Sequence, residues 1–215
     1  GVGGSGLTTG GGGGGSAAQH AQPALVVCDG SDVEVERCDI KSAAGVAVLV
    51  RDKVTEPQVL ACRVHGSGQG GFLFCNDSGG VLRGCVIRDH AMAAVNITTG
   101  AAPEVSRNTI VGGVFVFKRG CGVVRDNDIS SPAPKKAAAV EVRDDGSSPK
   151  VTGNRIHHTH GVAAYFHLGG GGVLTGNTIT DTDAECVEVA DPGTEPVVRD
   201  NVISNGKSVG IRIHS

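Results

Sequence analysis

The stretch Gly122-Val123-Val124-Arg125-Asp126-Asn127-Asp128-Ile129 decides the fold, because shorter copies of it recur along the chain. Four copies keep the pattern Asn, any residue, Ile, at Asn108–Ile110, Asn154–Ile156, Asn177–Ile179 and Asn201–Ile203. Three earlier copies have Cys in place of Asn, at Cys38–Ile40, Cys62–Val64 and Cys85–Ile87. From position 38 to position 201 there are seven steps, so the mean period is about 23 residues. A period of this length indicates a repeat architecture.

The composition favours many short strands over helices. The 215 residues include 35 Gly and only 3% aromatic residues, and no window shows a convincing helical pattern of apolar residues. The net charge of −3 is spread along the chain without a basic block, which argues against a nucleic-acid partner. No apolar run reaches transmembrane length and no signal sequence is recognisable at the start, so no membrane partner is expected.

Two sets of short apolar strands are predicted, without room for helices between them. Each strand is expected to pair in parallel with its counterpart one repeat later, which makes the chain an all-β parallel β-helix, a solenoid of about eight coils. The first set is Val48–Val50, Phe72–Phe74, Val95–Ile97, Val114–Phe117, Val140–Val142, Tyr165–Leu168, Val187–Val189 and Ile211–Ile213. The second set is Val59–Leu60, Val81–Leu82, Val105, Val123–Val124, Val151, Val173–Leu174 and Val197–Val198.

One packed domain is predicted after a leader. Residues 1–22 are low-complexity Gly and Ser, which cannot bury enough apolar surface to order themselves, so a linker or long loop is expected there. The β-helix is expected to span residues 23–215. Because the last coil is incomplete at Ser215 and would leave an open strand edge, we expect this stretch to be a fragment of a longer chain.

A longer period is superimposed on the short one. Gly-rich connections lie between four prolines that recur every 46 or 47 residues, namely Pro57, Pro103, Pro149 and Pro196. The sequence therefore predicts that alternate coils turn differently, one through a Pro-containing loop and the next through a Gly-containing bend.

The repeated Asn is predicted to be structural. Asn tolerates the left-handed backbone region that a bend needs, and amides stacked coil upon coil can bond to one another along the axis. The expected ladder consists of Asn108, Asn127, Asn154, Asn177 and Asn201. Because Cys cannot build an amide ladder, the three N-terminal coils are expected to be the less stable end.

The cysteines are predicted to be reduced and buried. There are seven of them, an odd number, and no C-x-x-C pair suggests zinc or redox chemistry. Cys38, Cys62 and Cys85 occupy equivalent places in successive repeats, where a disulfide ladder is the alternative. Reduced thiols that act as small apolar side chains would fit an intracellular protein.

At this point the residues carry a family resemblance. The alternation of GGFLFCNDSGGVLRGCVIRDHAMAAVNITTGAAPEVSRNTI with GGVFVFKRGCGVVRDNDI resembles the right-handed parallel β-helix repeats grouped with carbohydrate-binding proteins and sugar hydrolases. It is most similar to the repeats of F-box-only ubiquitin-ligase subunits and SHC-binding spindle-associated proteins. The resemblance covers about residues 23–215 and implies a right-handed coil that serves as a recognition scaffold in a eukaryotic cell. F-box helices are absent from the sequence, so ligase membership is not carried over.

Strand alternation predicts a candidate binding strip on the outer face of the first strand set. Aromatic rings supply stacking area for a sugar or peptide, while charged groups can fix its orientation. The alternatives are that another part of the parent chain covers this face, or that its charges only pair across strands. The strip consists of Phe115, Phe117, Glu141, Arg143, Tyr165, His167, Glu188 and Arg212.

A second polar cluster follows the Asn bends. His158 stacked one coil from Asp181 could bind a metal or shuttle a proton. The favoured interpretation is that this cluster is made of solvated loop residues, and neither a metal nor another cofactor is expected. The cluster comprises His157, His158, His160, Asp181 and Asp183, with Arg88, Asp89 and His90 several coils earlier.

Catalysis is the less favoured function. The resembling fold is also found in pectate lyases and polygalacturonases, which need a Ca²⁺ site or paired carboxylates. Glu141 and Glu188 lie two coils apart, about 10 Å by strand spacing, without a cluster of Asp on adjacent coils. We therefore expect a non-catalytic, intracellular protein-recognition or assembly scaffold, with a carbohydrate-binding or polysaccharide-cleaving domain as the alternative.

Overall fold

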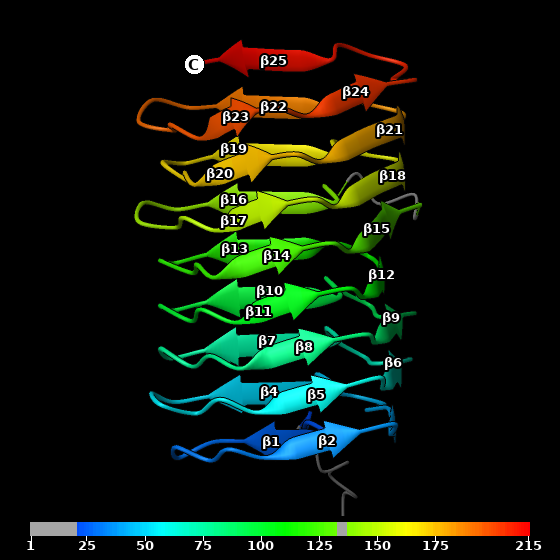
Figure 1. The fold of residues 1–215 in the computed structure, drawn as a ribbon, viewed down its shortest axis with the longest axis vertical. Coiled ribbons are helices and arrows are strands. Elements are labelled where there is room, and N and C mark those ends of the chain that lie inside the picture. The colour runs from blue at the N-terminus through cyan, green and yellow to red at the C-terminus, as the bar shows by residue number, and fades with distance from the viewer. Residues whose placement is uncertain (1–20, 133–136) are drawn as a thin grey trace, which may run out of the picture.

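The computed structural model describes residues 21–132 and 137–215, which form three parallel sheets and no helix (Figure 1). The predicted leader, residues 1–22, lies outside the described residues except for its last two. Within the described ranges, no helix has the length and apolarity needed to cross a membrane.

Each coil contributes one strand to each sheet, and we name the sheets A, B and C in chain order; sheet B faces the viewer in Figure 1 and sheet A lies behind it. Sheet A contains β1 (Leu25–Val27), β4 (Val48–Arg51), β7 (Phe72–Cys75), β10 (Val95–Thr98), β13 (Val114–Phe117), β16 (Val140–Arg143), β19 (Ala164–His167), β22 (Val187–Ala190) and β25 (Ile211–His214). Sheet B contains β2 (Glu34–Glu36), β5 (Gln58–Leu60), β8 (Val81–Arg83), β11 (Glu104–Ser106), β14 (Val123–Arg125), β17 (Lys150–Thr152), β20 (Val173–Thr175) and β23 (Val197–Arg199). Sheet C contains β3 (Asp39–Ile40), β6 (Arg63–His65), β9 (Val86–Arg88), β12 (Thr109–Val111), β15 (Asp128–Ser131), β18 (Arg155–Thr159), β21 (Thr178–Thr182) and β24 (Val202–Ser204).

Equivalent residues of successive coils lie in register. In sheet C, Ile110 pairs with Ile129, which pairs with Ile156 in the following coil. In sheet A, Val95 pairs on one side with Phe72 and on the other with Val114. The predicted all-β parallel solenoid of about eight turns is therefore confirmed.

The prediction of two strands per repeat is wrong, because each coil has a third strand in sheet C. In a typical strand of this sheet only one apolar residue is buried, as with Ile110 in β12 and Ile156 in β18. A single buried apolar residue gives no alternation of apolar and polar residues, so the sequence pattern alone does not reveal these strands.

The interior is a continuous apolar column. Val, Ile, Leu and Phe fill it, and the largest fully buried side chains include Phe72, Phe74 and Phe166. The rings of Phe72 and Phe74 stack with their centroids 5.9 Å apart. No coil could bury this surface alone, so each coil depends on its neighbours.

A column of buried amides runs along the corner between sheets B and C. The Oδ1 atom of Asn154 accepts hydrogen bonds from both the backbone N–H and the Nδ2 of Asn127, each at 2.9 Å. Asn127 Nδ2 also donates to the carbonyl of Val105 at 2.9 Å, and Asn127 Oδ1 accepts from the backbone N–H of Asn108. The pattern continues through Asn177 to Asn201, so each step joins two coils by polar bonds shielded from water.

The left-handed backbone lies one residue before each Asn, so the prediction that the Asn itself adopts it is wrong. The φ angle is 55° at Arg107, 56° at Asp126 and 67° at Gly153. These residues are exposed and only turn the chain, whereas the next residue must direct its amide into the column. The bend and the amide therefore make separate demands on neighbouring positions.

Cysteines extend the column toward the N-terminus with weaker bonds. The Sγ atoms of Cys62 and Cys85 accept the backbone N–H of the preceding column residue at 3.4 and 3.3 Å, and the N–H of Cys85 donates to Asn108 Oδ1 at 2.8 Å. Burial raises the pKa of Cys85 to about 12, which keeps this thiol protonated. All seven cysteines are free, but Cys38 is exposed, contrary to prediction, because it belongs to the first coil of the described chain.

The alternation of Pro and Gly connections has a steric cause. Gly80, Gly122 and Gly172 each lie directly against the proline carbonyl of the preceding coil, and an added Cβ would collide with that oxygen. All three have left-handed backbones, with φ of 100°, 90° and 102°. The next residue then donates its N–H to the same carbonyl, as Val173 does to Pro149 at 3.0 Å. A Pro-containing turn thus requires Gly in the coil above it.

We predict that Gly172→Ala destabilises the fold whereas Gly171→Ala does not. The first substitution combines a strained φ with a collision against backbone and is expected to lower the free energy of unfolding by about 2 kcal/mol or more. Gly171 has no left-handed φ and a Cβ added there would have its nearest neighbours at 3.8 Å, so its variant should stay within about 0.5 kcal/mol of the wild type. Urea unfolding measures both, and equal effects would contradict the steric account.

Candidate functional site

The eight strip residues all lie on the outer face of sheet A. Register pairs Phe115 with Glu141, Glu141 with Tyr165, and Tyr165 with Glu188, so these four side chains form one row along the axis. Arg212 follows Glu188 in β25. The remaining three strip residues, Phe117, Arg143 and His167, project from the same strands two positions later.

Contacts within the strip hold its side chains in place. Glu141 Oε1 lies 3.2 Å from His167 Nε2 and 3.5 Å from Arg143 Nη1. The Arg143 guanidinium lies over the Phe117 ring, 5.1 Å from its centroid. Tyr165 stacks on His167 with centroids 4.2 Å apart and an interplanar angle of 5°. The strip is therefore a preorganised surface whose charged and aromatic groups support one another.

A groove of about 600 Å³ opens beside this row, and we call it the acidic groove. Sheet A provides one wall, and the connections from sheet C to sheet A provide the other. Three of its glutamates are mostly buried, with side chains only 15–16% exposed. The lining residues are Ala137, Ala138, Glu141, His160, Gly161, Val162, Tyr165, Asp183, Ala184, Glu185 and Glu188.

An apolar hollow of about 370 Å³ adjoins the acidic groove nearer the N-terminal end. Phe115 and Met92 line it, together with His90 and Asn96, and Ala137 lines both depressions. The two depressions thus follow one another along the axis, and the second differs from the first in the four carboxylates that line it.

Electrostatic interactions shift the pKa of several groove residues. Hydrogen bonds from Lys207 and His160 lower the pKa of Asp183, and a backbone hydrogen bond together with Arg212 lowers that of Glu185. Burial and then repulsion from Glu188 raise the pKa of Tyr165. Near neutral pH Asp183 and Glu185 are therefore ionised, and Tyr165 is a neutral phenol.

The predicted histidine cluster is divided between two places. His157 pairs with Asp128 at 2.8 Å, whereas His160 pairs with Asp183 at 2.9 Å at the rim of the acidic groove. His158, His160, Asp181 and Asp183 line one hollow together with Lys207, but they do not form a group of three potential metal ligands in the described chain. Of the earlier residues in this cluster, Arg88 pairs with Asp89 at 2.7 Å, and His90 lines the apolar hollow.

Two functional residues were not predicted from the sequence. Glu185 lines the acidic groove from a connection between sheets, where no strand alternation indicates side-chain direction. Ala137, which lines both the groove and the hollow, was not predicted for the same reason, because it also lies between strands. The connecting segments vary in length from coil to coil, so the repeat does not predict which of their residues reach the groove.

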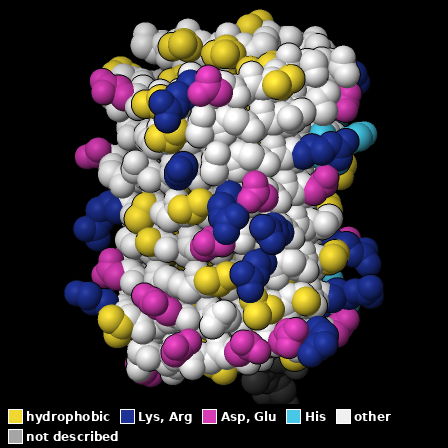
Figure 2. Space-filling model, viewed as in Figure 1, with side chains coloured by type: hydrophobic (Ala, Val, Ile, Leu, Met, Phe, Trp, Pro, Cys, Tyr) yellow, Lys and Arg dark blue, Asp and Glu magenta, His cyan; other side chains and the backbone are white. Residues whose placement is uncertain are grey.

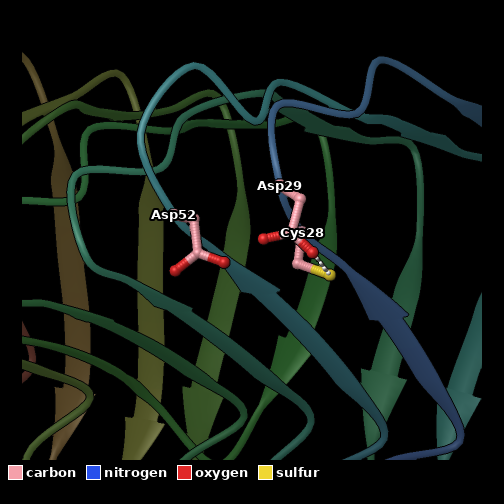
Figure 3. Close-up of side chains that lie close together, drawn as sticks. All are labelled: Cys28, Asp29 and Asp52. Carbon is pink, nitrogen blue, oxygen red and sulfur yellow. Dashed lines mark hydrogen bonds between the residues drawn. The ribbon is translucent and has the colours of Figure 1, made fainter.

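Figure 3 shows the one group of three potential metal ligands in the described residues. Cys28 and Asp29 lie in the turn after β1, and Asp52 lies in the turn after β4. Cys28 Sγ donates to Asp29 Oδ2 at 3.1 Å, and this hydrogen bond raises the pKa of the thiol. Asp52 is paired with Arg51 at 3.0 Å. A protonated thiol and a paired carboxylate are poor ligands, so the group is better explained as local turn chemistry.

The face of sheet B differs from that of sheet A. Figure 2 shows Lys and Arg side chains interspersed with Asp and Glu across it. Arg125 pairs there with Glu104 at 2.7 Å and with Asp126 at 2.8 Å. Mixed, mutually paired charges of this kind are typical of a solvated surface.

Comparison with known proteins identifies the fold family. The family model described as "Right handed beta helix region" matches residues 24–115 and 111–215. No curated protein and no solved structure matches the chain.

We predict that the environment of Tyr165 is measurable directly, because it is the only tyrosine in the chain. Alkaline titration of phenolate absorbance should give a pKa above that of free tyrosine. Glu188→Gln removes a nearby negative charge and should lower this pKa, whereas Glu104→Gln on sheet B should leave it unchanged. A pKa that is insensitive to Glu188 would contradict the described arrangement.

Proposed function

The chain belongs to the right-handed β-helix family, and from this premise we propose that it is a non-catalytic recognition module. In this proposal it binds an extended segment of a partner protein along the outer face of sheet A. The observation that carries the proposal is the row Phe115, Glu141, Tyr165 and Glu188 on four consecutive coils, beside two adjoining depressions.

The row favours a linear ligand. Parallel strands place the four side chains about 4.8 Å apart along the axis, on a sheet whose coils are locked in register. An extended segment lying along the axis would meet the apolar hollow at Phe115 and the acidic groove at Tyr165. The strip also contains Phe, Tyr and Arg, which are the residue types enriched in protein interfaces.

The contacts of the glutamates support recognition over catalysis. Glu141 is engaged by His167 and Arg143, and Glu188 is engaged by His214 at 2.9 Å. Tyr165 occupies the coil between them. Carboxylates that are each paired with a basic side chain are suited to holding a ligand, whereas a glycoside hydrolase needs one carboxylic acid that is free to protonate the leaving group.

The proposal extends to the cellular setting. We propose that the module works inside a eukaryotic cell as the substrate-binding part of a larger complex, in the manner implied by the resemblance to F-box-only and SHC-binding proteins. All seven cysteines are free, which supports a reducing compartment.

A second candidate function is oligosaccharide binding. The rings of Tyr165 and His167 are parallel and stacked on each other, which fixes the Tyr165 ring between carboxylates of the adjacent coils. An aromatic ring held in this way stacks on a sugar ring while the carboxylates accept hydrogen bonds from its hydroxyls.

We predict that peptides selected from a random display library against the protein bind through this face. Tyr165→Ala and Phe115→Ala should each weaken the selected peptides by about tenfold or more, because both remove an aromatic anchor. Thr175→Ala, an outward residue of sheet B, should leave binding unchanged.

The same variants tested on an oligosaccharide panel separate the two candidates. Sugar binding that depends on Tyr165, with no peptide selected, would replace the recognition module by the second candidate. Ca²⁺-dependent cleavage of uronate polymers would overturn both.

A further inference from the structure

Among the described residues, the lining of the acidic groove contains carboxylates but no Lys or Arg. Four carboxylates line it, those of Glu141, Asp183, Glu185 and Glu188, and His160 is the only basic side chain among the described lining residues. A groove with this lining is complementary to a cation.

The cations that pair with these carboxylates approach from outside the groove. Arg143, Arg212 and Lys207 have side chains 41%, 53% and 76% exposed, whereas the three glutamates are 15–16% exposed. The acidic groups are therefore mostly enclosed by protein, while their cationic partners reach them from the solvent side. Each carboxylate also has acceptor positions beyond those already occupied, so a ligand cation can add to the pair.

The floor of the groove suits a long aliphatic stem. Ala137, Ala138, Val162 and Ala184 provide apolar lining between the carboxylates. Lys and Arg side chains combine a methylene stem with a charged end, and they bury the stem along apolar surface while the end remains paired. The lining thus matches a basic side chain better than a small inorganic cation.

Strand spacing selects the conformation of the ligand. Glu141 and Glu188 lie two coils apart, which is about 9.6 Å. A polyproline II segment rises about 3.1 Å per residue and returns to the same face after three residues, about 9.3 Å. In a β-strand, side chains on one face recur at about 6.8 Å, which matches neither one coil nor two.

We propose that the acidic groove binds a partner segment in polyproline II conformation with basic side chains three residues apart, one at Glu141 and one at Glu188. This inference rests on the proposed recognition function and specifies its ligand. Tyr165, between the two glutamates, packs against the intervening residues of the segment.

The test uses a fluorescent peptide, Gly-Lys-Pro-Pro-Lys-Pro-Pro-Lys-Gly, in an anisotropy titration at low salt. A control peptide with the same three lysines and four prolines, Gly-Pro-Lys-Pro-Lys-Pro-Lys-Pro-Gly, moves the lysines to a spacing of two. The first peptide is expected to bind about tenfold more tightly than the control, and added salt is expected to weaken it.

Matched variants of the protein test whether the peptide binds at these two glutamates. Glu141→Gln and Glu188→Gln together should weaken the first peptide about tenfold or more, whereas Glu104→Gln on sheet B should change its affinity less than twofold. Unchanged unfolding midpoints confirm that all variants are folded.

The outcomes separate this inference from the proposed function. Equal affinity for the two peptides, or loss of binding in Glu104→Gln alone, overturns the inference. If display selection yields only neutral or acidic peptides that depend on Tyr165, the recognition module stands and the basic ligand is overturned. If no peptide of any kind binds, both are overturned.

Discussion

The buried amide column is the interaction on which the rest of the structure depends. At each step one Asn oxygen accepts two hydrogen bonds from the coil before it, and one Asn nitrogen donates to a strand carbonyl. These groups are 1–2% exposed from Asn108 to Asn177, so an unmatched partner would be left without water. A coil that slipped by one residue would therefore leave several buried polar groups unpaired, and this penalty fixes the register.

Fixed register allows the connections to vary. Column neighbours are 19 residues apart between Asn108 and Asn127 but 27 apart between Asn127 and Asn154, with hydrogen bonds of the same length. Most of the added residues fall between β15 and β16, and the described residues Ala137 and Ala138 of that connection line the acidic groove. The column thus aligns the outward row of sheet A, while the variable connections give that row a depression in which a ligand can lie.

The sequence predicts which residues stack in columns better than it predicts the turns and connections around those columns. Alternation in strands such as Val140–Arg143 predicts that Glu141 and Arg143 face outward, and the Asn-any-Ile copies predict which residues stack. Sheet C was missed because most of its strands bury a single apolar residue. The left-handed residue was misplaced because the position before each Asn varies, with Arg107 in one coil and Asp126 in the next. Glu185 could not be predicted, since the direction of a side chain between strands depends on the path of that particular connection.

The most direct test of the column is a graded substitution at Asn154, measured by urea unfolding. Asn154→Ala removes the acceptor of the buried N–H of Asn127 and the side-chain donor to the carbonyl of Val124, and should lower the free energy of unfolding by about 2–4 kcal/mol. Asn154→Cys should cost clearly less, because its sulfur accepts the N–H of Asn127 as Cys85 accepts that of Cys62. Equal losses for the two variants, or no loss for Asn154→Ala, would contradict the claim that buried hydrogen bonds along this column hold the coils in register.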